Sequence, residues 1–280
     1  MLSTARGDDA ITVGSFDFPE SVVLAEVYSR ALEAGGFRVE RAFGLGAREF
    51  VEPALSVGLI DLLPEYAGTA LTFRTMGAVL PSADPAETHR DLVGAFEGSG
   101  ISVLAMAPGE DANAFVVTAE TARRLGLSRL SDLAAVATGL TFGGPAECPS
   151  RPFCLIGLEQ RYGVEFGTVA TLDPGGPVTR QALDDGSVDV GLLFTTDPTL
   201  PGYVELADDR RLQPAENVTP LLRREVVDRW GPDVVELIDA VSRQLDTESL
   251  RELNAANAQS PGSDDVAAIA GAWLRSRVPS

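Results

Sequence analysis

The hydrophobic and polar positions at the start of the chain follow two periods in turn, first that of a strand and then that of a helix. Residues 10–14 form a short apolar run that ends in a Gly-Ser turn, which is typical of a strand end. The segment 17–20, Asp-Phe-Pro-Glu, predicts a helix start with Asp17 as the N-cap. Apolar residues then recur at helical spacing from Val23 to Leu32. We therefore expect a strand, a tight turn and a helix.

Similar units follow along most of the chain. We expect further strands at 38–43, 59–63, 115–118, 138–142 and 169–172. We expect helices at 48–57, 84–97, 119–125, 155–162 and 178–185, and in the last third at 223–230, 234–245, 249–258 and 264–275. Because strands alternate with helices, the pattern predicts an α/β fold with parallel sheets.

One short pattern occurs twice, some 128 residues apart. Gly58-Leu-Ile-Asp61-Leu and Gly186-Ser-Val-Asp189-Val both combine a helix-ending glycine with a strand that starts on an aliphatic–Asp–aliphatic triplet. The repeat has two interpretations: two lobes of similar construction, or a chance match of a sequence pattern that is common at helix–strand junctions. A length of 280 residues also fits two medium domains.

The composition narrows the possible functions. The 22 basic residues are all arginine, against 41 acidic residues, which gives a net charge of −19. Without lysine, a Walker loop and a Schiff-base enzyme are excluded, and His89, expected on an exposed helix, is the only histidine for a catalytic triad. Cys₄ and Cys₂His₂ zinc sites lack ligands, and so acidic a chain is a poor partner for nucleic acid. No stretch is apolar enough to span a bilayer, and residues 1–9 lack the apolar core of an export signal, as they would after removal of a leader.

In open α/β sheets, ligands lie beyond the carboxyl ends of the strands, and a cleft between two lobes is the default site. The candidate loops are 14–18, 44–48, 63–69, 106–113, 142–154 and 193–197. In the third of these, Tyr66 follows an apolar strand and either projects toward the cleft or packs under a helix start.

The two cysteines, Cys148 and Cys154, lie in the 142–154 loop. Five residues separate them, which is too many for a CxxC redox site. A disulfide between them would fix Arg151 in position and would imply an oxidising compartment. The alternative is a pair of free thiols in the core.

Four segments, at 11–20, 58–72, 111–117 and 189–197, together resemble the substrate-binding proteins of ABC transporters for glycine betaine, choline and carnitine. The most specific part is Pro64-Glu-Tyr66-Ala-Gly-Thr69, and the resemblance extends from about residue 11 to residue 224. It implies an α/β, bilobal type II periplasmic-binding-protein fold with a two-crossing hinge. Lobe 1 would comprise 1–106 and 212–280, and lobe 2 would comprise 107–211.

Proteins of this family hold a quaternary ammonium in a cage of aromatic rings by cation–π attraction, and basic and hydroxyl side chains meet the ligand carboxylate. Tyr66 and Thr69 match the family pattern. Asn113, Phe194 and Glu216 occupy positions where the family often has tyrosine, and Phe16 replaces a lysine. Arg151 lies where the family's carboxylate-binding arginine is expected, with Arg48 as a second candidate. The ligand-binding set implied by the resemblance is Ser15, Phe16, Arg48, Tyr66, Thr69, Asp111, Asn113, Arg151, Phe194, Glu216 and Asn217.

The resemblance implies an extracytoplasmic binding protein of an ABC importer that captures an osmoprotectant-type solute. We expect a monomeric lipoprotein at the cell surface that works with an ABC permease and its ATPase subunits, without a cofactor, a metal or enzymatic activity. Three alternatives remain: a neutral hydroxylated or aromatic ligand on the same fold, a ligand-sensing domain or permease fusion, and a small-molecule enzyme whose catalytic base we do not find.

Overall fold

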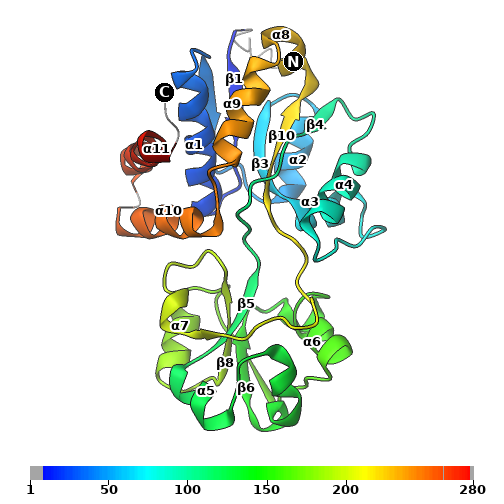
Figure 1. Ribbon diagram of the computed structural model, residues 1–280, viewed down its shortest axis with the longest axis vertical. Coiled ribbons are helices and arrows are strands. Elements are labelled where there is room, and N and C mark those ends of the chain that lie inside the picture. Colours follow the sequence, from blue (N-terminus) through cyan, green and yellow to red (C-terminus); the bar gives the residue numbers. More distant parts are fainter. Residues whose placement is uncertain (1–8, 261, 278–280) are drawn as a thin grey trace. The chain divides into compact units, whose positions relative to one another are not determined.

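The computed structural model describes residues 9–260 and 262–277 and divides the chain into two compact units (Figure 1). Unit 1 comprises residues up to Pro81, Ala86–Glu110 and the chain from Glu216 onward, and unit 2 comprises Ser82–Pro85 and Asp111–Ala215. The first eight residues, where we expect no export signal, lie outside the described part.

Unit 1 is built on a five-stranded sheet in the order β2-β1-β3-β10-β4. The first three strands are parallel, and β10 runs antiparallel to both of its neighbours. Its strands are β1 (Ile11–Gly14), β2 (Val39–Ala42), β3 (Leu62–Tyr66), β4 (Ile101–Val103) and β10 (Val218–Arg223). Its helices are α1 (Pro19–Ala34), α2 (Arg48–Ser56), α3 (Ala67–Arg74), α4 (Pro85–Ala95), α8 (Arg224–Trp230), α9 (Asp233–Ser242), α10 (Thr247–Gln259) and α11 (Ser263–Arg277). Helix α1 packs against α9, α10 and α11 (Figure 1).

Unit 2 has a second five-stranded sheet, in the order β7-β6-β8-β5-β9. Its strands are β5 (Asn113–Val117), β6 (Thr141–Gly144), β7 (Thr168–Thr171), β8 (Val190–Phe194) and β9 (Val204–Glu205), and its helices are α5 (Ala119–Leu125), α6 (Leu155–Tyr162) and α7 (Pro177–Asp184). Alternate residues of β5 enter two separate apolar clusters, Phe115 and Val117 in one and Ala114 and Val116 in the other. Both faces of this sheet are therefore buried, as expected for helices on two sides.

Apart from the short segment Ser82–Pro85, the chain passes between the units at Glu110–Asp111 and Ala215–Glu216, a few residues beyond the expected boundaries. Hydrogen bonds from backbone N–H groups explain the difference. Ala107 N donates to Val218 O, which keeps residues 107–110 with unit 1. Leu212 N donates to the Asp208 carboxylate, which keeps residues 212–215 with unit 2.

Two local expectations at α-helices are wrong. Helix α1 begins at Pro19 with Phe18 as its N-cap and no side-chain cap, so Asp17 does not cap it. Asp17 is exposed instead, and Glu20 is buried with hydrogen bonds of its own. His89 is half-buried rather than exposed, and its Nε2 lies 2.8 Å from Leu104 O.

Strand β10 is absent from the expected elements, and its sequence contains Pro220, a residue type that is disfavoured in central strands. The structure pairs Pro220 of β10 directly with Pro64 of β3. Since neither residue has an N–H group, the two prolines occupy one ladder position that needs no hydrogen bond between them. Strand β3 also begins later than expected, at Leu62, so that Tyr66 is its last residue.

The sequence repeat has the same structural role in both units. In unit 1, Asp61 N donates to Thr12 O, and Thr12 N donates to the Asp61 carboxylate at 2.9 Å. In unit 2, Asp189 N donates to Thr141 O, and Thr141 N donates to the Asp189 carboxylate at 3.0 Å. The preceding glycines, Gly58 and Gly186, have φ of 78° and 75°. The repeat therefore reflects two sheets of similar construction rather than a ligand site.

We expect Asp61→Ala and Asp189→Ala each to lower the free energy of unfolding by about 1–3 kcal/mol, because each leaves a strand N–H without its acceptor. The loss should be larger for Asp61, whose side chain is 9% exposed, than for Asp189, which is 27% exposed. Urea unfolding monitored by circular dichroism measures both. Asp228→Ala, on the exposed face of α8, is the control, and equal stability of all three variants would contradict the assignment.

Candidate functional site

Three aromatic rings form a row at the carboxyl edge of the unit 1 sheet. Phe16 and Phe18 lie in the loop after β1, and Tyr66 ends β3, which is parallel to β1. The centroids of Phe16 and Phe18 are 5.7 Å apart, and those of Phe18 and Tyr66 are 5.9 Å apart. Phe16 and Tyr66 are buried, whereas Phe18 is 38% exposed. Phe18 therefore presents the most accessible aromatic surface of this row, which we call the ring row.

An arginine of the protein itself occupies one end of the ring row. The Arg48 guanidinium, at the start of α2, lies 4.9 Å from the centroid of the Phe16 ring. It also forms a bidentate ion pair with Glu65, with Nε–Oε1 at 2.6 Å and Nη2–Oε2 at 2.9 Å. Burial disfavours the charged guanidinium, but the Glu65 charge and hydrogen bonds prevail and raise the pKa of Arg48. Because Arg48 is paired with Glu65, it is a weaker candidate for binding the carboxylate of a ligand.

Tyr66 is oriented by a buried carboxylate. Its hydroxyl donates to Glu20 Oε1 at 2.6 Å, and Asn254 Nδ2 of α10 donates to the other oxygen of the same carboxylate. The Tyr66 N–H donates to Glu65 Oε2 at 2.7 Å. The ring is therefore held from both its hydroxyl and its backbone, which favours a fixed binding surface over a mobile one.

Glu216 lies beside this group, immediately before β10. Its Oε2 accepts hydrogen bonds from Thr69 N at 3.0 Å and from Thr69 Oγ1 at 2.9 Å. Burial raises the pKa of Glu216 to about 7, although the Thr69 hydrogen bonds and the Arg48 charge lower it, and the Glu65 charge raises it further. Among the described residues, no cation forms an ion pair with Glu216.

The charges of this group do not balance. Glu65 and Glu216 are both carboxylates, and Arg48 is the one arginine of the described structure that forms an ion pair with either of them. A ring row next to carboxylates in excess favours a cationic group, because ring faces and carboxylates both attract positive charge. The unit 1 part of the candidate site is therefore suited to a cation.

Two predicted residues of unit 1 have structural contacts. Ser15 is fully buried, where its Oγ donates to Phe16 O and accepts from Gly44 N. Asn217 Nδ2 donates to Ala107 O and Pro108 O, which ties β10 to the chain before the first crossing. Both residues shape the loops around the ring row.

In unit 2, the predicted disulfide between Cys148 and Cys154 is present, and both cysteines are buried in an apolar cluster. Arg151 lies in the exposed turn between them. Within residues 9–260 and 262–277, its guanidinium makes no hydrogen bond or ion pair with another side chain. Unlike Arg48, Arg151 thus keeps its charge available for an anionic group.

The remaining unit 2 candidates lie near this turn or at the same edge of the sheet. Asn113, at the start of β5, pairs in register with Phe194 at the end of β8. Its Nδ2 donates to Phe153 O in the disulfide loop and to Gln213 Oε1, so that Asn113 anchors the loop that carries Arg151. Asp111 accepts a hydrogen bond from Thr196 Oγ1 at 2.8 Å, just beyond β8.

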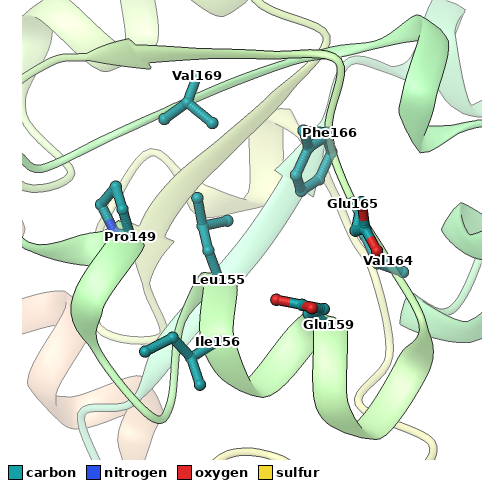
Figure 2. Close-up of a pocket in the computed structure, with 8 residues that line it drawn as sticks. All are labelled: Pro149, Leu155, Ile156, Glu159, Val164, Glu165, Phe166 and Val169. Carbon is teal, nitrogen blue, oxygen red and sulfur yellow. The ribbon is translucent and has the colours of Figure 1, made fainter.

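A separate pocket of about 270 Å³ lies between α6 and β7 in unit 2 (Figure 2). Figure 2 shows Leu155, Phe166 and Val169 around it, with the exposed carboxylates of Glu159 and Glu165 on one side. None of the predicted ligand-binding residues lines this pocket.

Comparison with known families decides the class. The family "Substrate binding domain of ABC-type glycine betaine transport system" matches residues 9–276. The chain belongs to this family. It is thus the substrate-binding component of an ABC transport system, a class that pairs with a permease and an ATPase and acts outside the cytoplasm.

Individual relatives agree with this membership. A glycine-betaine-binding protein of Pseudomonas aeruginosa is 28% identical over 260 residues, which cover 88% of this chain and 82% of that protein. The ergothioneine transport permease/ergothioneine binding protein EgtU of Helicobacter pylori is 22% identical over 238 residues, covering 84% of this chain and 42% of that protein.

A solved structure confirms the fold. The crystal structure of a glycine betaine/carnitine/choline ABC transporter protein superposes with a TM-score of 0.83 at 23% identity, covering 95% of this chain and 98% of that one. The expected α/β periplasmic-binding-protein fold is therefore confirmed. The part of the chain that the structure describes holds no helix long and apolar enough to cross a membrane. In the same part, no group of three or more His, Cys, Asp or Glu side chains could hold a metal.

Sequence reasoning missed three members of the unit 1 site: Phe18, Glu20 and Glu65. Phe18 and Glu65 lie within the candidate loops 14–18 and 63–69, but neither they nor Glu20 belong to the predicted ligand-binding set. A usable signal was the strand end itself, since all three residues lie within four positions of a β-strand end or of another candidate residue.

The raised pKa of Glu216 predicts a pH-dependent stability. Between about pH 4.5 and about 7, the folded protein keeps a proton that the unfolded chain has released, so this group lowers stability as pH rises through that window. The difference in free energy of unfolding between the wild type and Glu216→Gln should therefore change with pH. From pH 5 to pH 8, the wild type should lose on the order of 2 kcal/mol relative to the variant. Urea unfolding at both pH values measures this difference. Glu159→Gln, an exposed control, should differ from the wild type by the same free energy of unfolding at both pH values. A pH-independent difference for Glu216→Gln would contradict the raised pKa.

Proposed function

We propose that this chain captures a small methylated-ammonium solute, of the glycine betaine, carnitine and choline type, and delivers it to an ABC permease. The observation that carries this proposal is the ring row of Phe16, Phe18 and Tyr66 beside carboxylates that exceed their arginine. A methylated ammonium is poorly hydrated and positively charged, so aromatic faces bind it well. The family membership supports the same class of solute.

Arg151 supports a zwitterion over a simple cation. Glycine betaine and carnitine carry a carboxylate that requires a positive partner, and choline does not. Arg151 is held in an exposed turn closed by a disulfide, without a carboxylate partner among the described residues. An arginine can bind a carboxylate through two parallel hydrogen bonds. We therefore assign Arg151 to the ligand carboxylate and rank zwitterions first.

The cellular setting follows from the proposed role. The chain acts as a monomer without catalytic activity, attached to the outer surface of the cell as a lipoprotein. The disulfide between Cys148 and Cys154 supports an oxidising compartment. Its partners are the solute, the permease and the ATPase subunits.

A second candidate ligand is a betaine with an aromatic ring or a hydroxylated, neutral molecule. Glu216 and Asn113 are polar where a purely aromatic cage would have rings, which favours a ligand with hydrogen-bonding groups. The relative EgtU is named for ergothioneine, a trimethylated betaine that also carries a ring. The name of that relative also includes a permease. The corresponding alternative for this chain is therefore a ligand-sensing domain or a binding domain fused to a permease.

The first test is binding of a solute panel to the purified chain. Glycine betaine and carnitine should raise the melting temperature more than choline, polyols or phenolics, because a bound ligand stabilises the folded state by mass action. Ergothioneine tests the second candidate. Stabilisation by polyols or phenolics alone would overturn the proposal, as would turnover of any member of the panel.

The second test is substitution of the assigned residues. Tyr66→Ala and Arg151→Ala should each weaken binding of the best ligand at least tenfold in calorimetry. Phe18→Leu keeps an apolar side chain but removes the ring face, so it should weaken binding several-fold through the lost cation–π attraction alone. Arg123→Ala, on the exposed face of α5, is the matched control for charge in unit 2. Unchanged affinity in both alanine variants would exclude the assigned site.

A further inference from the structure

Glu216 accepts hydrogen bonds through only one of its two carboxylate oxygens in the described structure. Both hydrogen bonds from Thr69, through N and Oγ1, go to Oε2. Within the described part of the chain, no hydrogen bond reaches Oε1. Glu216 is only 9% exposed, but Oε1 is not among the fully buried side-chain atoms without a partner in the described chain, so this oxygen lies at the surface of the site. A ligand that carries a positively charged N–H group can therefore donate a charge-assisted hydrogen bond to it.

The groups around Glu216 do not supply that donor. The charge of Arg48 in α2 acts on Glu216, but the two Arg48 nitrogens that form hydrogen bonds are both paired with Glu65 of β3. Glu65 adds a second negative charge, and Thr69 of α3 already serves Oε2. On the remaining side, the Glu110 carboxylate accepts the backbone N–H of Glu216, so it adds a further acid and no cation.

Glu216 is also connected to the ring row. Tyr66 and Thr69 belong to one segment, in which α3 begins directly after β3. Ala67 N donates to Asn217 O, which places Glu216 next to the residue that follows Tyr66. Arg48 lies over the Phe16 ring, and its charge also acts on Glu216. The open carboxylate oxygen and the aromatic faces therefore belong to one group of residues.

A fully methylated ammonium cannot satisfy such an oxygen, because it has no N–H. A partly methylated ammonium has the same charge and nearly the same size, and it can donate a charge-assisted hydrogen bond. Resting on the proposed function, we propose that Glu216 is a specificity-determining residue that makes this site prefer a partly methylated ammonium zwitterion over its fully methylated analogue.

The test is a series in which methyl groups on nitrogen are replaced by hydrogen: glycine betaine, dimethylglycine and sarcosine. All three carry one positive and one negative charge, so differences within the series isolate the N–H donor. By calorimetry at pH 8, wild-type protein should bind dimethylglycine about tenfold more tightly than glycine betaine. Glu216→Gln has nearly the same shape but no charge, and the preference should shrink toward unity. Glu159→Gln, at the unit 2 pocket, should keep the wild-type preference.

A second measurement needs no variant. Because burial raises the pKa of Glu216 to about 7, wild-type protein at pH 5.5 carries mostly the neutral acid there, and the preference should be several-fold smaller than at pH 8. Equal or tighter binding of glycine betaine by wild-type protein at pH 8, or an unchanged preference in folded Glu216→Gln, would overturn the inference and leave the proposed function intact. Binding of none of the three compounds, and of neither carnitine nor choline, would overturn the proposed function itself.

Discussion

The bidentate ion pair between Arg48 and Glu65 is the interaction on which the unit 1 site depends. It joins the start of α2 to the end of β3, next to Tyr66 of the ring row. The same guanidinium covers the Phe16 ring. A buried pair of this kind is costly to break from one side, because the remaining charge is left without a partner. Since the Arg48 guanidinium is held by Glu65, it forms no ion pair with Glu216, and the two carboxylates exceed the one arginine at this edge of the sheet.

Much of the fold could be predicted from the sequence, because most of its elements are local. The boundaries of α5 and α6 follow from apolar residues at helical spacing, and the repeated Gly–Asp junctions correspond to equivalent junctions in the two sheets. Strand β10 could not be predicted in this way. Its place in the sheet depends on pairing Pro220 with Pro64, some 150 residues earlier, and local rules count a proline against a central strand.

The candidate site shows the same contrast between residues that local segments predict and contacts that depend on distant parts of the chain. Tyr66, Thr69 and Arg151 could be predicted as site residues because each lies in a recognisable segment or between two cysteines. The charge relations were not predictable, since Glu216 meets Thr69 only after β10 has returned the chain to β3. Arg48 was predicted as a candidate for the ligand carboxylate, and the sequence has no signal that Glu65 pairs with it. For an acidic chain, the number of possible ion pairs is too large for spacing to select one.

The contacts of Arg48 show why lysine could not replace arginine at this position. An ammonium at position 48 would present a single point charge, whereas the planar guanidinium binds both oxygens of Glu65 and stacks on Phe16 at the same time. The protein thus provides its own cation for Phe16, the most buried ring of the row. A ligand cation is then left with Phe18 and Tyr66, of which Phe18 is the more exposed. An aromatic row that is partly filled by an internal arginine has fewer ring faces to offer, and the remaining attraction for a cation must come from carboxylates such as Glu216.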